Sequence, residues 1–270
     1  MLKRGGEKGQ VTIFIIVAIL IVIMGILIYM FYPQIKASLG GGVENPGSYI
    51  QTCIGEEIQT AVDTLSSQGG SINPEHYILY QDTKIEYLCY TGEYYLTCVV
   101  QQPMLKNHIE SEIESEIRDE VKTCFDNLKE SYEKKGYSVN LRKEEMDVEL
   151  LPKRIVTTFN YSLALKKGDD SQTYKTFRVV LDNNLYELVS IANSIISWET
   201  KYGDAETTTY MNYYHDLKVE KKKQSDGSTI YILTDRNTGD KFQFASRSVA
   251  WPPGYGASGV VMTSYATQGS

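Results

Sequence analysis

The chain has 270 residues, of which 42% are hydrophobic and 23% are charged, so it is long enough to bury a core in one large domain or two small ones. Its formal net charge is -7 at pH 7. An acidic domain of this kind is a poor candidate for binding nucleic acid or anionic lipid head groups, and we expect no nucleic-acid partner.

The first predicted element is a transmembrane helix at residues 11–33, which follows a basic leader at residues 1–10. No charged residue occurs from Val11 to Phe31, and about twenty helical residues at roughly 1.5 Å each span a hydrocarbon core of roughly 30 Å. A cleaved secretory signal has a shorter apolar region that ends in small residues, whereas this one ends in aromatic residues and Pro33. Because the basic residues come first, we expect a single-pass membrane protein with a cytoplasmic N-terminus and everything after Pro33 outside the cell.

This N-terminal segment resembles the class III signal peptide of type IV pilins and their archaeal relatives. Gln10 and Thr12 match the archaeal pattern, whereas Phe14 stands where the family has a glutamate. In that family a membrane peptidase cuts before the apolar helix, which then packs into a filament core. The resemblance therefore implies processing between Gly9 and Gln10, followed by assembly into a filament. The start "KGQVTIF" and the cysteine-bearing portion that follows also resemble uncharacterised archaeal single-pass surface proteins.

Glycine and polar residues at 34–47 predict a flexible stalk, which leads into an ectodomain at residues 48–252. Ser48 and Gln51 form a capping box that begins a helix, and Gly69 ends it. Residues 85–100 alternate and turn near Gly92, which predicts a β-hairpin.

The strongest helical pattern covers residues 105–135, and beyond Gly136, a possible sub-boundary, the hydrophobic period switches to two. We expect one long strand over 155–165, a partner strand after the turn at 168–170, and a helix from Asn184 to Gly203 with Glu187 in a capping box. Three more strands follow, at 217–221, 229–234 and 242–249, before a flexible tail at 253–270. The predicted fold class is α+β, with antiparallel sheets covered by about three helices.

Four cysteines lie beyond the transmembrane segment, and none forms a CxxC pair or has a histidine nearby. Disulfide bonds are therefore favoured over a zinc site. The simplest pairing joins two helices through Cys53 and Cys124 and closes the hairpin through Cys89 and Cys98. Two other pairings remain possible from the sequence.

The sequence contains no HExxH, GxSxG, Walker or GxGxxG motif, and its three histidines show no ligand spacing. We therefore expect no catalytic residues, no metal and no cofactor. The unusual feature is the number of tyrosines, 21 against 7 phenylalanines. Tyrosine suits half-buried strands, but it also suits contact surfaces. The candidate contact residues are Tyr90, Tyr94, Tyr95, Tyr213 and Tyr214. Asn160-Tyr161-Ser162 is a glycosylation sequon within a predicted strand.

These features favour a non-enzymatic, membrane-anchored surface protein whose disulfide-bonded ectodomain contacts other proteins, with a pilin-like filament subunit as its most concrete form. The alternative is an anchored binding or sensing module for an external ligand. A third class is an extracytoplasmic enzyme whose site has no sequence motif.

Overall fold

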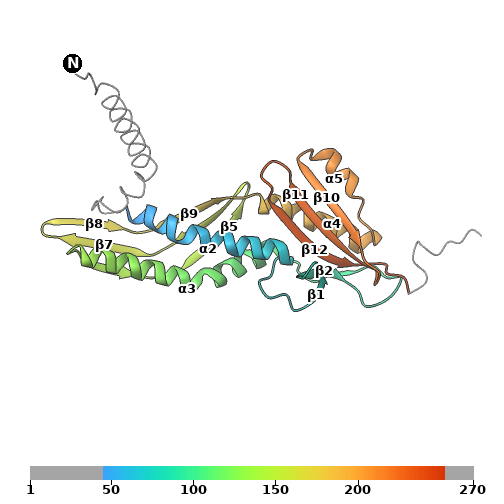
Figure 1. Cartoon of the computed structure of the whole chain (residues 1–270), viewed down its shortest axis with the longest axis horizontal. Coiled ribbons are helices and arrows are strands. Elements are labelled where there is room, and N and C mark those ends of the chain that lie inside the picture. The colour runs from blue at the N-terminus through green and yellow to red at the C-terminus, as the bar shows by residue number, and fades with distance from the viewer. Residues whose placement is uncertain (1–44, 253–270) are drawn as a thin grey trace, which may run out of the picture. The chain divides into compact units, whose positions relative to one another are not determined.

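The computed structural model describes residues 45–252, which belong to one compact unit (Figure 1). Its helices are α2 (Pro46–Gln68), α3 (Leu105–Lys134), α4 (Leu185–Tyr202) and α5 (Thr207–Tyr213). Its strands are β1 (Tyr77–Tyr80), β2 (Thr83–Tyr90), β3 (Val99–Val100), β4 (Ser138–Arg142), β5 (Met146–Leu151), β6 (Arg154–Phe159), β7 (Ser162–Lys167), β8 (Asp170–Tyr174), β9 (Phe177–Asp182), β10 (Leu217–Lys223), β11 (Ser228–Asp235) and β12 (Lys241–Arg247). The α+β class is confirmed, and α5 is a helix that the sequence pattern did not predict.

Within residues 45–252, no helix combines the length and apolar character needed to cross a membrane. The predicted leader, the transmembrane helix at 11–33, the Gly9–Gln10 bond, most of the stalk and the tail at 253–270 all lie outside the described residues.

The two capping-box predictions are wrong in detail. α2 begins at Pro46, because the Asn45 side chain accepts a hydrogen bond from the Gly47 N–H at 2.9 Å and proline fits the first helical position. Ser48 therefore lies inside the first turn. At the start of α4, the Glu187 carboxylate accepts from the backbone N–H of Lys153 at 3.0 Å instead of capping its own helix.

Residues 138–182 form a three-stranded antiparallel meander in which each long strand is interrupted once, giving the sheets β4-β7-β8 and β5-β6-β9. The single strand predicted over 155–165 is therefore two strands, β6 and β7, separated by Asn160 and Tyr161. The alternation survives the break, since Phe159, Tyr161 and Leu163 are all buried. The Tyr161 ring lies 4.6 Å from that of Phe125 on α3. The period-two pattern therefore predicted that one face of this segment is buried along its length. It did not indicate that the hydrogen bonds between strands continue without a break.

The larger sheet has the order β1-β2-β12-β11-β10, with β3 beside β2. Its pairs are antiparallel except β12 with β2, which run parallel, so the expectation of purely antiparallel sheets is wrong at this pair. The predicted hairpin over 85–100 is shorter than expected, because β2 pairs with β3 at only two residue pairs, Cys89–Val100 and Tyr90–Val99. The longer hairpin partner of β2 is β1, across a turn at Gln81 and Asp82.

The main hydrophobic core joins the meander and the larger sheet to the helices. α2 and α3 pack side by side, and α2 contacts β9 of the meander and β12 of the larger sheet (Figure 1). α4 packs against β11, β12 and β2. The core includes buried side chains from before and after residue 136, such as Ile54, Phe125 and Phe244. The larger sheet and α4 therefore share this core with the meander.

Candidate contact surface

Two disulfide bonds form, in the pairing that the sequence favoured. Cys53–Cys124 joins α2 to α3 with a Cα–Cα distance of 6.2 Å. Cys89–Cys98 has a Cα–Cα distance of 5.4 Å and closes the loop between β2 and β3. Both cysteines of the second bond are buried, so this bond fixes the base of the loop from inside the core.

The loop at residues 91–98 is held against the chain that follows β12. The N–H of Thr91 donates to the Arg247 carbonyl at 3.0 Å, and the N–H of Tyr95 donates to the Ala250 carbonyl at 3.0 Å. In the other direction, the N–H of Val249 donates to the Leu96 carbonyl at 2.7 Å. These backbone bonds order a loop that has no regular secondary structure of its own.

Arg247 fills the space beneath this loop. Its guanidinium donates to the Thr91 carbonyl at 2.5 Å and to the Asp226 carbonyl at 3.1 Å. The same group lies 6.0 Å from the ring centroid of Tyr90 and 5.4 Å from that of Tyr94, within the range of cation–π attraction. A buried arginine therefore orients two of the predicted contact tyrosines.

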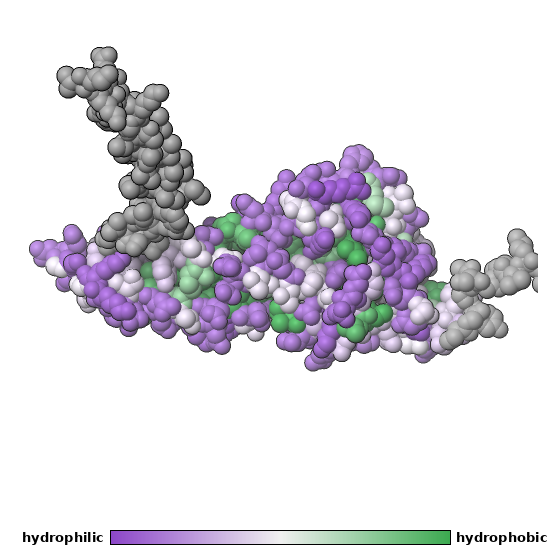
Figure 2. Space-filling view, viewed as in Figure 1, coloured by the Kyte–Doolittle hydropathy of each residue, from purple (hydrophilic) through white to green (hydrophobic). Residues whose placement is uncertain are grey.

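Four large side chains project from this region into solvent, and we call them the aromatic loop surface: Tyr94, Tyr95, Leu96 and Trp251. Tyr95 and Trp251 are 53% and 54% exposed, and their rings meet edge to face at 5.1 Å. On the C-terminal turn of α4, which hydrogen-bonds to Ser248, the rings of Trp198 and Tyr202 are also exposed. The face shown in Figure 2 is largely hydrophilic, with hydrophobic residues in small separate spots.

Two residues here have positive φ although they are not glycine, Tyr95 at 62° and Val249 at 45°. A left-handed backbone is costly for residues other than glycine, above all for a β-branched residue such as valine. Backbone strain of this kind persists only where surrounding structure enforces it, and it concentrates at functional sites. The hydrogen bond from Val249 to Leu96 and the Tyr95 bond to Ala250 provide that enforcement.

The structure separates the five tyrosines that the sequence grouped. Tyr90 pairs with Arg247 at the end of β12, and Tyr94 and Tyr95 contact Ala250 just beyond it. Tyr213 and Tyr214 lie at the end of α5, just before β10 begins at Leu217. Leu217 pairs with Asp235, at one end of β11. Arg247 pairs with Ser228, at the other end of β11. At about 3.3 Å per residue, the seven residues of β10 put roughly 20 Å between the two ends. Tyr213 and Tyr214 therefore do not belong to the aromatic loop surface.

Sequence reasoning missed Arg247, Leu96 and Trp251. In the sequence, Arg247 is one residue of a predicted strand, and Trp251 directly precedes two prolines at the end of the predicted ectodomain. Their one sequence signal is that Trp251 is one of only two tryptophans in the chain. Only the parallel pairing of β12 with β2 brings Arg247 and Trp251 beside Tyr94 and Tyr95.

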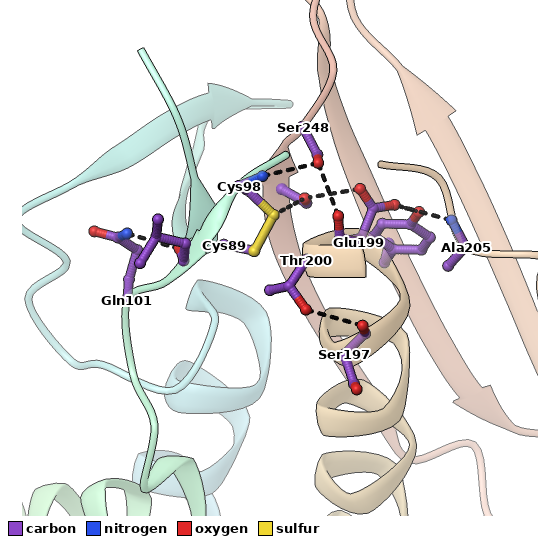
Figure 3. The surroundings of a disulfide bond; sticks show 11 residues. Cys89, Cys98, Gln101, Ser197, Glu199, Thr200, Ala205 and Ser248 are labelled. Carbon is purple, nitrogen blue, oxygen red and sulfur yellow. Dashed lines mark hydrogen bonds between the residues drawn. A yellow bond between two sulfur atoms is a disulfide. The ribbon is translucent and has the colours of Figure 1, made fainter. Parts of the chain in front are cut away.

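A polar network supports the loop from below (Figure 3). The Cys98 N–H donates to the Ser248 hydroxyl at 3.0 Å, which in turn donates to the backbone carbonyl of Glu199 at 2.9 Å. The buried Glu199 carboxylate accepts from Ser246 at 3.2 Å and also from the Tyr231 hydroxyl and the Ala205 N–H. Burial raises the pKa of Glu199, although the bonds from Tyr231 and Ala205 act in the opposite direction.

This raised pKa predicts a pH dependence of stability. A group whose pKa is higher in the folded state contributes stability that is full below its unfolded pKa, near 4.5, and is lost as the pH rises through the folded pKa. Glutamine can keep the bonds from Tyr231 and Ala205 without titrating. We therefore expect the free energy of unfolding of Glu199→Gln to fall less than that of the unchanged protein between pH 4.5 and 7, in urea titrations at a series of pH values.

Glu220→Gln is the matched control. Hydrogen bonds from Lys218 and Lys222 lower the pKa of Glu220 to about 2, so its contribution is present above pH 4.5 and is lost as the pH falls toward 2. Replacing it can lower the free energy of unfolding by a constant amount above pH 4.5, but it should leave the slope of the profile in that range unchanged. Parallel profiles for Glu199→Gln and the unchanged protein above pH 4.5 would contradict the assignment.

A second polar cluster contains the residue types of a hydrolase triad in a different arrangement. The Ser71 hydroxyl contacts both His108 Nε2, at 2.8 Å, and the Glu86 carboxylate. In a triad the carboxylate orients the histidine, whereas here both groups meet the same serine oxygen, and Ser71 is only 6% exposed. Burial raises the pKa of Glu86. The cluster ties the end of α2 to β2 and α3, so its geometry is that of a structural contact.

Among the described residues, no three histidine, cysteine, aspartate or glutamate side chains are placed to hold a metal ion. No protein-family model matches the chain, and comparisons with curated proteins and with solved structures find no significant match.

Proposed function

We propose that this protein is a membrane-anchored extracytoplasmic protein that contacts other proteins through its aromatic loop surface. The observation that carries the proposal is the exposure of Tyr94, Tyr95 and Trp251 where the chain after β12 meets a loop fixed by a buried disulfide and a buried arginine. Aromatic side chains are enriched at the centres of protein interfaces, and a loop ordered in advance loses less entropy on binding.

Two further features support an extracytoplasmic location. Disulfide bonds persist in oxidising compartments and are rare in the cytosol, and all four cysteines of this chain are paired. The uncharged run from Val11 to Phe31 behind basic residues has the length and orientation of an outward-directed anchor.

The most concrete form of the proposal is a pilin-like subunit, in which the segment after Gly9 joins a filament core and the aromatic loop surface contacts a neighbouring subunit. Mass spectrometry of the mature N-terminus distinguishes this form from a simple anchor. A chain that begins at Gln10, recovered from shed filaments, is the result expected of a pilin-like subunit. An intact leader would instead favour the anchored binding or sensing module, which would use the same aromatic loop surface for an external ligand.

We expect the double variant Tyr95→Ala/Trp251→Ala to weaken assembly on the cell surface, because truncating a central aromatic residue at an interface costs about 2 kcal/mol or more, or about 30-fold in affinity. The readout is the fraction of the protein recovered in high-molecular-weight surface material after chemical crosslinking. The matched control is Tyr213→Ala, which removes a 78% exposed tyrosine outside the aromatic loop surface. Equal recovery of the double variant and the control would contradict the assignment of the contact surface.

A further inference from the structure

Asn160-Tyr161-Ser162 is the only Asn-X-Ser/Thr sequence in the chain with X other than proline. It falls at the interruption between β6 and β7, where neither Asn160 nor Tyr161 belongs to a strand. The sequon was expected inside a continuous strand, where a regular ladder would hold its backbone. The structure instead places Asn160 and Tyr161 in a gap of the ladder.

Asn160 points away from the core at this gap. Phe159 and Tyr161 on either side of it are buried, whereas Asn160 is exposed. Its backbone N–H donates to the Glu145 carbonyl at 3.0 Å. The side chain lies on the strand face that also carries Thr158, which pairs with the exposed Asp147 and Arg178 on the two neighbouring strands.

The segments level with Asn160 in the neighbouring strands are also open. Residues 143–145, between β4 and β5, and residues 175–176, between β8 and β9, are exposed. Three helices contact the meander: α2 packs against β9, α3 packs against β4 and β5, and α4 contacts β5. The ring of Phe125 on α3 meets Tyr161 on the core side. A bulky group on Asn160 would therefore extend into solvent without displacing a described element.

We propose that Asn160 is modified with an N-linked oligosaccharide. The inference rests on the proposed function, because only an exported chain meets the lipid-linked sugar donor and its transferase. In the reaction, Nδ2 of Asn160 forms a bond to the anomeric carbon of an oligosaccharide carried on a polyprenyl phosphate or diphosphate. The bond from that carbon to the phosphate oxygen breaks, the lipid phosphate leaves with the electron pair, and the amide gives up one proton to a base of the transferase.

The serine of the sequon is reachable for the same structural reason. Ser162 is the first residue of β7, where it pairs with Arg142 at the last position of β4. Fraying this one end of the β4–β7 ladder and breaking the Asn160–Glu145 bond exposes the three-residue sequon. Local opening of a strand end costs far less than global unfolding.

The test is peptide mapping of the full chain purified from the cells that produce it. Trypsin releases residues 155–166, which contain the whole sequon, by cutting after Arg154 and Lys166. We expect this peptide to carry additional mass in hexose-type units, and we expect that mass to disappear in Asn160→Gln and in Ser162→Ala. Ser162→Thr preserves the sequon and should keep the modification. The peptide that contains Asn237, an exposed asparagine outside any sequon, should be unmodified.

The same sample separates failure of this inference from failure of the proposed function. Alkylation of free thiols before digestion reports whether the four cysteines are oxidised. An unmodified 155–166 peptide from a chain with both disulfides formed overturns the glycan while leaving the extracytoplasmic location intact. Free thiols at the cysteines together with an unmodified peptide would contradict both the glycan at Asn160 and the extracytoplasmic location. Additional mass that persists in Asn160→Gln also overturns the assignment, since it places the modification on another residue.

Discussion

Replacing Cys53 and Cys124 together by alanine is expected to lower the free energy of unfolding by roughly 4 kcal/mol. The bond closes a loop with a sequence separation of 71 residues, and the entropy that it removes from the unfolded chain grows with the logarithm of loop length. Replacing both cysteines avoids leaving a free thiol between α2 and α3. Urea unfolding at neutral pH, with the slope compared between proteins, measures the change.

The matched control is the double variant Cys89→Ala/Cys98→Ala. This bond spans a sequence separation of only 9 residues, for which the same chain-entropy relation gives roughly 2.5 kcal/mol. Two cysteines are replaced by two alanines in each case, so loop length is the main difference between the variants. An equal or larger loss for the short loop would show that stabilisation by these bonds is not set by the entropy of the unfolded chain.

Gly203→Ala is expected to destabilise the protein by roughly 3 kcal/mol, by combining left-handed backbone strain with overpacking. Gly203 ends α4 with φ +76°, and a Cβ atom at this position would lie 1.9 Å from Cγ2 of Val249. Val249 has little freedom to move, because its N–H is bonded to Leu96 and its own φ is positive. The substitution should therefore also speed hydrogen exchange at the Val249 amide, which reports on the base of the aromatic loop surface.

Gly239→Ala separates the two causes. Gly239 has a similar φ of +83°, but a Cβ atom there would have no neighbour within 4 Å. Only the strain of the left-handed backbone remains, so we expect the free energy of unfolding to fall by roughly 1–2 kcal/mol. Hydrogen exchange at the Val249 amide should be unchanged. Equal losses for the two variants in urea unfolding would mean that the contact between Gly203 and Val249 is not as tight as described.

The aromatic loop surface combines exposed apolar rings with an unusually constrained backbone. The disulfide Cys89–Cys98, Arg247 and the short ladder from Thr91 to Ala250 all restrict the same eight-residue loop. Exposed aromatic residues on a loose loop would lose conformational entropy on binding, whereas these are already positioned. This arrangement is the physical reason for proposing a contact role for a loop that has no regular secondary structure.

Local sequence patterns predicted the elements whose signals are short-range. The stripe of apolar residues every three to four positions from Leu105 to Tyr132 corresponds to the buried face of α3. The glycines after α2 and α4 end those helices in the left-handed conformation, as predicted. The sequence also predicted which side chains of residues 155–165 are buried, because alternation depends only on the strand backbone. It did not predict the break at Asn160, since alternate side chains stay buried across the break.

By itself, the sequence therefore determined the α+β class, the three long helices, most strands and the favoured cysteine pairing. Hydrophobic periodicity, helix caps and turns depend on residues a few positions apart, so a short stretch of sequence is enough to predict them. The tertiary structure alone decided that β12 lies parallel to β2, which brings Arg247 and Trp251 to Tyr94 and Tyr95. It also placed Tyr213 and Tyr214 at the other end of the sheet. The order of strands in a sheet depends on the packing of residues far apart in the chain, and no local pattern records it.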